Sequence, residues 1–152
     1  MKVLLINPKC TTGKARWIPL GLAYIASVLI KAEFKVKVMD GDISGMQDFE
    51  PDVVGISATT PQIDEAWRIA EEVKKMMPLT TVVLGGVHPT IKPLESLVRD
   101  YVDFVVLGEG EETMKELCLA LEHRTPFQLV DGIAYKDGYS IVVTKPRELI
   151  KD

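Results

Sequence analysis

The stretch Val82–Thr90 reads Val-Val-Leu-Gly-Gly-Val-His-Pro-Thr, and it decides how the chain is expected to fold. An apolar run ends there in two glycines, and the His-Pro-Thr that follows can open a helix. Gly85 and Gly86 have no Cβ, so the backbone can turn through a positive φ or let another group approach closely. A strand, a glycine turn and a helix in this order build ligand sites at the carboxyl ends of strands in open α/β sheets.

Four further apolar segments end in the same way, in polar residues or glycine. These expected strands are residues 3–6, 36–39, 53–56 and 104–107. Between them, apolar residues at helical spacing predict four helices. The first runs from Pro19 to about Ala32, and the second begins at Pro61, with Thr60 as N-cap, and stops at Pro78. The third runs from about Pro89 or Thr90 to Asp100, and the fourth contains Met114–Leu121. Strands that alternate with helices imply a parallel sheet with right-handed crossovers. We therefore expect an α/β fold with a doubly wound, five-stranded parallel sheet in the order 2-1-3-4-5.

The pattern changes from Leu129 onward. Two apolar runs, residues 133–135 and 140–143, flank a turn that contains Asp-Gly, which is a strong signal of a β-hairpin. A Lys-Pro-Arg stretch then begins a tail that resembles a linker. The sequence thus predicts an α/β domain over residues 1–128, a C-terminal hairpin of the same domain over residues 129–146, and the start of a linker over residues 147–152.

Composition narrows the class of protein. The chain has 152 residues, which fits one domain, and its hydrophobic content of 47% argues against disorder. The nearly apolar stretch from Ile18 to Ile30 is too short to cross a bilayer, so we expect a helix that is buried or covered by something outside this chain. No signal peptide precedes the first strand, so we expect a cytoplasmic protein without membrane insertion. A net charge of −4 with scattered basic residues argues against nucleic acid as a partner.

The chemistry-bearing residues do not form an enzyme's catalytic set. The two cysteines, Cys10 and Cys118, cannot build a Cys-rich metal site alone, and we expect no metal ligands from the protein. Cys118 falls on an apolar helical stripe and is expected in the core. Cys10 lies in the first loop, where its thiol is either structural or near a ligand. No nucleophile, base and acid occur together, so the residues alone indicate a binding domain.

In the expected strand order, four loops meet at one edge of the sheet. They present Asn7, Ser57, Gly85 and Gly108, and such a convergence favours a ligand site, although polar residues and glycines also simply end strands. Phosphate-binding motifs fail there, because neither a Walker loop nor a Gly-x-Gly-x-x-Gly fingerprint is complete. Glu109 could accept hydrogen bonds from a ligand or favour the start of a helix.

His88, one of two histidines, has two readings as well. It could donate a hydrogen bond to a ligand or act as a general base. It could instead be a residue at a helix entry that hydrogen-bonds the backbone.

Six motifs occur in a characteristic order: Asn-Pro at 7–8, Pro-Leu-Gly-Leu-Ala-Tyr-Ile-Ala at 19–26, Asp-Val-Val-Gly-Ile-Ser at 52–57, Gly-Gly-Val-His-Pro-Thr at 85–90, Asp-Phe-Val-Val at 103–106 and Gly-Glu-Gly-Glu at 108–111. From Met1 to about Pro146 the chain resembles the N-terminal cobalamin-binding domain of cobalamin-dependent radical S-adenosylmethionine enzymes. That group includes methyltransferases and the anaerobic magnesium-protoporphyrin IX monomethyl ester oxidative cyclase. The resemblance implies a Rossmann-like sheet that holds cobalamin at its carboxyl edge, with the nucleotide tail in a groove lined by the third- and fourth-strand loops.

The resemblance also implies which residues contact the cofactor. Related domains carry Ser-x-Leu/Thr and Gly-Gly in those two loops, matched here by residues 57–59 and 85–86. Domains of the methionine-synthase type carry Asp-x-His-x-x-Gly, whose His ligates cobalt, but this chain has no His at that place, so we expect no lower protein ligand. The full set of candidate cofactor-binding residues is Asn7, Pro8, Cys10, Gly13, Ser57, Ala58, Thr59, Thr60, Gly85, Gly86, His88, Pro89, Gly108, Glu109 and Gly110.

The family's radical domain brings a Cys-x3-Cys-x2-Cys cluster site, which this chain lacks. A 4Fe-4S cluster and S-adenosylmethionine are therefore expected only in an absent downstream radical domain, the expected partner, and the domain alone is expected to have no turnover. The sequence leaves the reaction open between methyl transfer and ring formation. Two other functions stay open: a flavodoxin-like binding or regulatory module for another ligand such as a flavin, for which residues 11–13 (Thr-Thr-Gly) are a weak phosphate signal, and a ligand-free docking domain.

Overall fold

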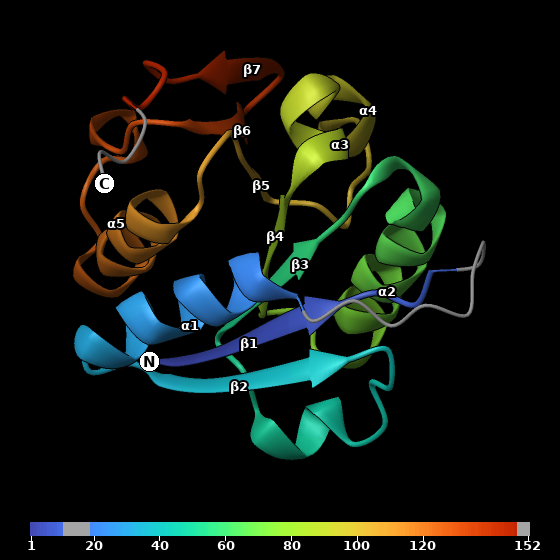
Figure 1. Ribbon diagram of the computed structural model, residues 1–152. Helices are drawn as coiled ribbons and strands as arrows, with labels where there is room; N and C mark the ends of the chain where they lie inside the picture. Colours follow the sequence, from blue (N-terminus) through green and yellow to red (C-terminus); the bar gives the residue numbers. More distant parts are fainter. Residues whose placement is uncertain (11–18, 149–152) are drawn as a thin grey trace.

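Seven strands form one sheet in the computed structural model, which describes residues 1–10 and 19–148 (Figure 1). In space their order is β2-β1-β3-β4-β5-β6-β7. In chain order the strands are β1 (Lys2–Asn7), β2 (Lys35–Asp40), β3 (Val53–Ser57), β4 (Thr81–Gly85), β5 (Phe104–Val106), β6 (Ile133–Asp137) and β7 (Ser140–Val143). Of the expected site residues, Gly13 lies outside the described residues.

The first five strands are parallel and lie in the order 2-1-3-4-5. The sheet nevertheless has seven strands rather than the expected five, because the C-terminal hairpin extends it. β6 pairs antiparallel with β5, with Val105 opposite Ala134, and β7 pairs antiparallel with β6. Without the hairpin, the backbone N–H and C=O groups along one side of β5 would have no strand to pair with. Residues 133–135 pair with them, and their buried side chains add to the core.

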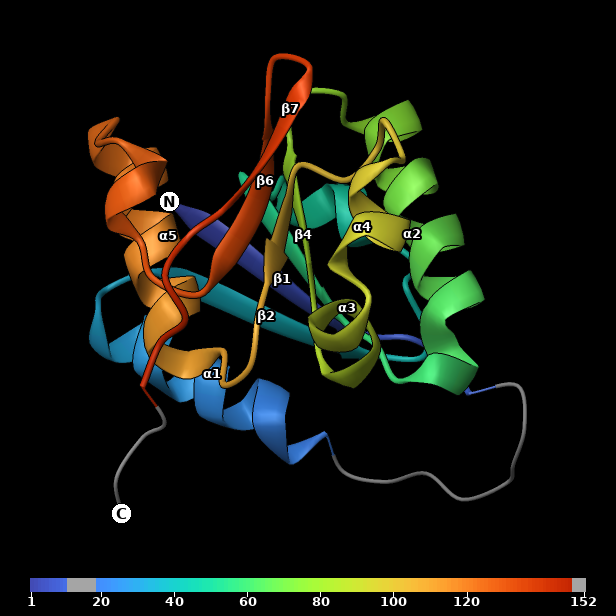
Figure 2. The same ribbon diagram turned by 90° about the horizontal axis from the view of Figure 1, so that it is seen from above.

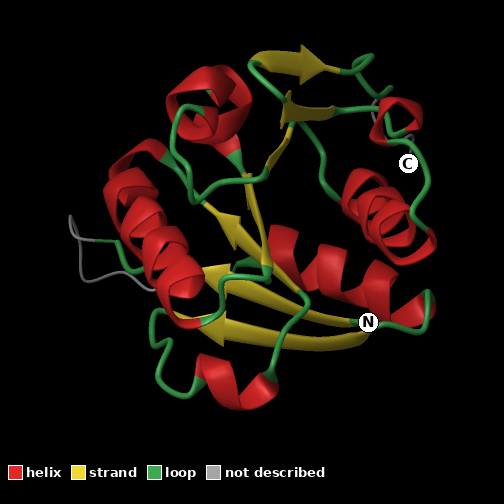
Figure 3. Cartoon of the chain, turned by 180° about the vertical axis from the view of Figure 1, so that it is seen from behind, coloured by secondary structure: helices red, strands yellow, loops and turns green. Residues whose placement is uncertain are grey.

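Helices cover both faces of the sheet (Figure 2). One face packs against α1 (Leu20–Lys31) and α5 (Glu111–His123), and the other against α2 (Ile63–Met76) and the short helices α3 (Val87–Ile91) and α4 (Pro93–Leu97). The view from behind in Figure 3 shows the same two layers. Three short 3-10 turns complete the described structure: η1 (Met46–Phe49), η2 (Thr60–Gln62) and η3 (Phe127–Leu129).

Strand β1 divides its side chains between the two faces because successive residues of a strand point in opposite directions. Leu4 and Ile6 belong to the core under α2, whereas Val3 and Leu5 belong to the core under α1 and α5. All four side chains are buried, as expected for a strand covered on both sides.

Two helix starts differ from the sequence-based expectation. Thr59, not Thr60, caps the segment before α2, through a capping box with Gln62, so a 3-10 turn precedes the helix. The expected helix over residues 89–100 is instead two short helices, since Pro93 has no N–H to continue the first one and begins the second.

Helix α1 keeps an apolar surface in contact with solvent. Leu22, Ala26 and Leu29 are buried against the sheet, but Leu20 and Tyr24 on the opposite side are 61% and 63% exposed. No helix among the described residues is long and apolar enough to cross a membrane. The first turn of α1 lies beside the candidate site described next, because Gly21 and Leu22 line its cavity.

Candidate functional site

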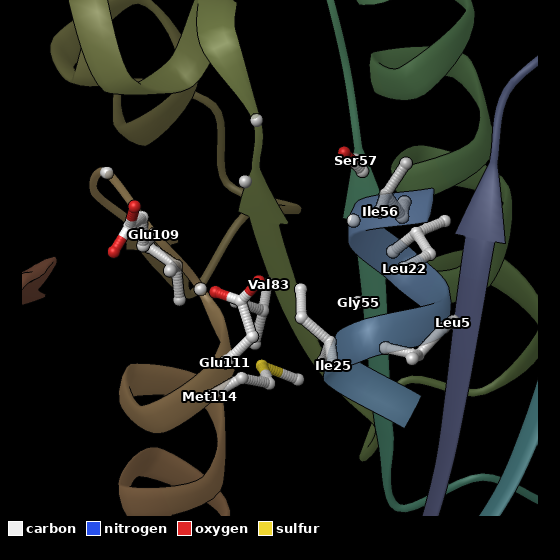
Figure 4. A pocket seen from close by; sticks show the side chains of 16 residues that line it. Leu5, Leu22, Ile25, Gly55, Ile56, Ser57, Val83, Glu109, Glu111 and Met114 are labelled. Atoms are coloured by element: carbon white, nitrogen blue, oxygen red, sulfur yellow. The ribbon is translucent and has the colours of Figure 1, made fainter. Parts of the chain in front are cut away.

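A cavity of about 200 Å³ opens at the carboxyl edge of the sheet, between the strands, the first half of α1 and the start of α5 (Figure 4). Its walls are mostly apolar side chains and glycines. The lining residues are Leu5, Gly21, Leu22, Ile25, Gly55, Ile56, Ser57, Val83, Gly85, Gly86, Val106, Gly108, Glu109, Gly110, Glu111 and Met114. They come from β1, β3, β4, the carboxyl end of β5 with the loop that follows it, and both helices on that face of the sheet.

Gly55 creates the depth of the cavity. It lies inside β3, and a Cβ there would stand 3.0 Å from Leu5 Cδ2 and 3.2 Å from Met114 Cε. A side chain at this position would therefore press on both neighbours. Glycine inside a strand often marks a place where another group approaches the backbone closely, and here it leaves open the space between the sheet and α5.

Gly86 shapes the mouth of the cavity. Its φ of 94° and ψ of −172° belong to a region that only glycine adopts without strain. A Cβ at Gly86 would lie 2.8 Å from the carbonyl oxygen of Ala58 and 3.0 Å from Ser57 Oγ. A backbone hydrogen bond joins the same two loops: the Ala58 N–H donates to Gly85 O at 2.8 Å. The Ser-Ala-Thr and Gly-Gly loops are thus held against each other by backbone contact.

The loop after β5 forms the opposite rim. Gly108 has a φ of 72°, and its N–H donates to Thr90 Oγ1 at 3.0 Å. A Cβ at Gly110 would lie 3.0 Å from Ile25 Cδ1, so this glycine allows the loop to approach α1. Glu109 and Glu111 are the charged residues that line the cavity. An apolar hollow with acceptor oxygens suits a flat ligand with N–H or O–H donors better than a phosphate group.

The structure brings together part of the expected site. Six expected residues line the cavity: Ser57, Gly85, Gly86, Gly108, Glu109 and Gly110. Eight others among the described residues lie outside its lining: Asn7, Pro8, Cys10, Ala58, Thr59, Thr60, His88 and Pro89.

The first loop is fixed to the start of α2. The Gln62 side-chain amide donates to Pro8 O at 2.7 Å and to Asn7 Oδ1 at 3.2 Å, and Asn7 donates to Asp40 at 2.8 Å. Cys10 is exposed at the end of this described stretch. These residues share the carboxyl edge with the cavity but do not enter it.

The His88 side chain is buried on the α2 face. Its Nδ1 lies 3.2 Å from Thr60 Oγ1, its Nε2 lies 3.1 Å from Glu95 Oε2, and its ring meets Trp67 edge-on at 6.1 Å. Hydrogen bonds, first from Lys92 and then from His88, lower the pKa of the Glu95 carboxyl. The backbone N–H of His88 donates to Ala58 O at 3.2 Å, so His88 connects the start of α3 to the loop after β3.

Sequence reasoning did not identify several residues that line the cavity: Gly21, Leu22, Ile25, Gly55, Glu111 and Met114. Of these, Gly55 is the residue that the sequence could have indicated. Glycine weakens a strand interior, so its presence inside β3 points to a place where another group approaches the backbone. Cys118, in contrast, is fully buried as expected, and burial raises its pKa to about 12. Among the described residues, no group of three or more His, Cys, Asp or Glu side chains could hold a metal ion.

A doubly wound sheet with a glycine-lined cavity at its carboxyl edge defines a ligand-binding α/β domain. Comparison with known proteins identifies which one: residues 9–118 match the B12 binding domain, and the chain belongs to this family. The family resemblance expected from the motifs is thereby confirmed.

The similar proteins are longer enzymes. The chain is 37% identical to an uncharacterized methyltransferase, PH0819, of Pyrococcus horikoshii, over all of this chain and 36% of that protein. It is 30% identical to the anaerobic magnesium-protoporphyrin IX monomethyl ester cyclase of Synechocystis, over all of this chain and 34% of that protein. The chain thus spans about a third of the length of these two relatives.

Solved structures share the fold. The cobalamin-dependent S-adenosylmethionine radical enzyme OxsB, with aqua-cobalamin and S-adenosylmethionine bound, superposes with a TM-score of 0.86 at 21% identity, over 97% of this chain and 22% of that one. The radical S-adenosylmethionine methyltransferase TsrM from Kitasatospora setae, with cobalamin and a [4Fe-4S] cluster bound, gives 0.78 at 22% identity, over 99% of this chain and 30% of that one. At these identities the likeness establishes the fold.

Proposed function

We propose that this domain binds cobalamin, with the corrin over the carboxyl edge of the sheet and the nucleotide tail in the cavity between the sheet, α1 and α5. The observation that carries the proposal is the cavity itself, because it is apolar, open at the edge and deepened by Gly55. A flat aromatic base would bury its faces against the aliphatic walls, which favours binding through the removal of apolar surface from water.

The Ser-Ala-Thr loop after β3 and the Gly-Gly loop after β4 would hold the nucleotide tail at the mouth of the cavity. Ser57 supplies a hydroxyl there, and Gly85 and Gly86 leave the backbone uncovered, so polar parts of the tail can approach main-chain groups. The residues of the same edge that lie outside the cavity, including Asn7, Cys10 and Thr59, are proposed to face the part of the ligand that stays outside. Bound cobalamin would supply a cobalt centre that can carry a methyl group.

We further propose that the protein gives cobalt no lower histidine ligand. The ring nitrogens of His88 face Thr60 and Glu95 on the α2 side of the sheet rather than the cavity. His123 ends α5, whereas the cavity is lined by the start of that helix. The sequence place of the ligating histidine in other cobalamin domains is held here by Cys10.

The parent activity is proposed to be that of a cytoplasmic radical S-adenosylmethionine enzyme, of the methyltransferase or the oxidative cyclase type. Support comes from the longer relatives, of which this chain covers about a third. A radical domain with a 4Fe-4S cluster and S-adenosylmethionine would then act on the substrate, and this domain alone would have no turnover. The exposed residues Leu20 and Tyr24 of α1, next to the cavity, offer apolar surface for such a neighbour.

The test is retention of the cofactor. The purified domain is mixed with hydroxocobalamin, passed through gel filtration and examined by its visible spectrum. Corrin absorbance that elutes with the protein is the expected result. Loss of all corrin absorbance would overturn the proposal, and a parallel run with flavin mononucleotide would then separate a flavodoxin-like module from a docking domain without a ligand.

A further inference from the structure

Glu111 places in an otherwise apolar part of the cavity a carboxylate oxygen that no described residue hydrogen-bonds. It is the first residue of α5 and lines the cavity together with Met114, one turn further on. Figure 4 shows its carboxylate directed from α5 toward the cavity, beside Val83. Its Oε2 has no contact with solvent and no hydrogen-bond partner among the described residues.

An acceptor in this state destabilises the fold unless something donates to it. The amino end of α5 favours a negative charge at this position, which keeps the carboxylate in place without satisfying Oε2. None of the described residues that line the cavity is a lysine, an arginine or a histidine. A donor to Oε2 can therefore come from a ligand that enters the cavity.

We propose that Glu111 accepts a hydrogen bond from an N–H or O–H group of the ligand's nucleoside, and so helps to select the ligand; this inference rests on the proposed function. Two parts of a cobalamin-type tail carry such donors. A ribose hydroxyl is present in both cobalamin and its adenine analogue. An exocyclic amino group is present on adenine but absent from dimethylbenzimidazole, the base of cobalamin.

The apolar neighbours of Glu111 bear on this choice. Ile25, Val83 and Met114 line the cavity together with Glu111, and their apolar side chains suit the faces of a flat base. A base with an amino group at its edge would donate a hydrogen bond to Oε2. Dimethylbenzimidazole has no such group, so with cobalamin the donor would be a ribose hydroxyl. The residue can thus distinguish corrinoids by their lower base.

The experiment measures dissociation constants by visible-spectrum titration of hydroxocobalamin and of the adenine-containing hydroxopseudocobalamin. The proteins are the wild type, Glu111→Ala, Glu111→Gln and the matched control Glu112→Ala. Glu112 is the adjacent acid in the same turn, pairs with Lys115 and does not line the cavity. The melting temperature of each protein without ligand is recorded as well.

We expect Glu111→Ala to weaken binding by about ten- to hundredfold, the range for a lost hydrogen bond to a charged group, and Glu111→Gln to weaken it less because the amide keeps an acceptor. A loss for both corrinoids assigns the donor to the ribose, and a loss for pseudocobalamin alone assigns it to the base. The melting temperature of ligand-free Glu111→Ala should not fall, because an unsatisfied acceptor has been removed.

Wild-type affinity of Glu111→Ala for both corrinoids would overturn the inference, and so would a lower melting temperature with unchanged affinity, which would mean a purely structural role. A loss of similar size in Glu112→Ala would also overturn it, because the effect would then belong to the net charge. If the wild type binds neither corrinoid, the proposed function itself fails.

Discussion

Replacing Gly55 by valine tests the cavity most directly. A Cβ at this position would already stand 3.0 Å from Leu5 Cδ2 and 3.2 Å from Met114 Cε, so a branched side chain must push these neighbours aside. The space that Met114 can move into is the cavity of about 200 Å³. The substitution therefore fills the place where we put the tail, and valine itself is well suited to a strand.

The magnitude follows from the surface that the tail would bury. A bicyclic aromatic group buries roughly 150 to 250 Å², and at about 25 cal/mol per Å² this corresponds to roughly 4 to 6 kcal/mol. Exclusion of the base from the cavity should therefore raise the dissociation constant for hydroxocobalamin by at least about a hundredfold. Overpacking should at the same time lower the free energy of unfolding by about 1 to 3 kcal/mol.

The assay combines spectral titration with urea unfolding, and Val54→Ile is the matched control. Val54 is the neighbouring buried residue of β3, and its side chain points into the core on the opposite face of the sheet. Its extra methylene should destabilise the domain without affecting corrinoid binding. A folded Gly55→Val protein with the wild-type dissociation constant would refute the placement of the tail in this cavity.

Three further predictions concern the mouth of the cavity and the thiols. Gly86→Val should abolish corrinoid retention in gel filtration and lower stability by about 1 to 3 kcal/mol, because its Cβ would meet the Ala58 carbonyl at 2.8 Å; normal retention would argue against the tail's path. Cys10→Ala should leave the visible spectrum of bound cobalamin unchanged, and a shifted spectrum would show that the thiol reaches cobalt. Iodoacetamide at pH 8 should modify exposed Cys10 but spare Cys118, whose burial raises its pKa to about 12 and keeps it protonated; modification of Cys118 at an equal rate would contradict this.

Local pattern was sufficient for the parallel part of the sheet. Each strand is a short apolar run with its own turn signal, and the crossover rule leaves few ways to arrange such units. The position of the hairpin beside β5, in contrast, could not be predicted from local sequence patterns. Asp137-Gly138 predicts that β6 and β7 pair with each other, but the pairing of Ala134 with Val105 is a contact between distant segments that no local signal announces.

The same distinction applies to the site. Residues that end strands, such as Ser57 and Gly85, could be placed at one edge once the strand order was assumed. Residues that line the depth of the cavity lie inside elements, and their role depends on which face they present. Gly55 and Met114 meet only because β3 and α5 pack together, and the buried ring of His88 is fixed by contacts with α2 and α4 that the sequence does not reveal.

The hairpin has a consequence for the direction in which the chain leaves the sheet. β6 runs from Ile133, beside Val106, toward the amino ends of the parallel strands, and β7 returns so that Thr144 hydrogen-bonds Ile133 at 2.9 Å. Arg147 then binds Thr113, near the start of α5, at 2.8 Å. The described part of the chain therefore reaches, at Arg147, the rim that the corrin is proposed to cover. A second domain joined there by a short linker would be held at high local concentration beside the outer face of the corrin.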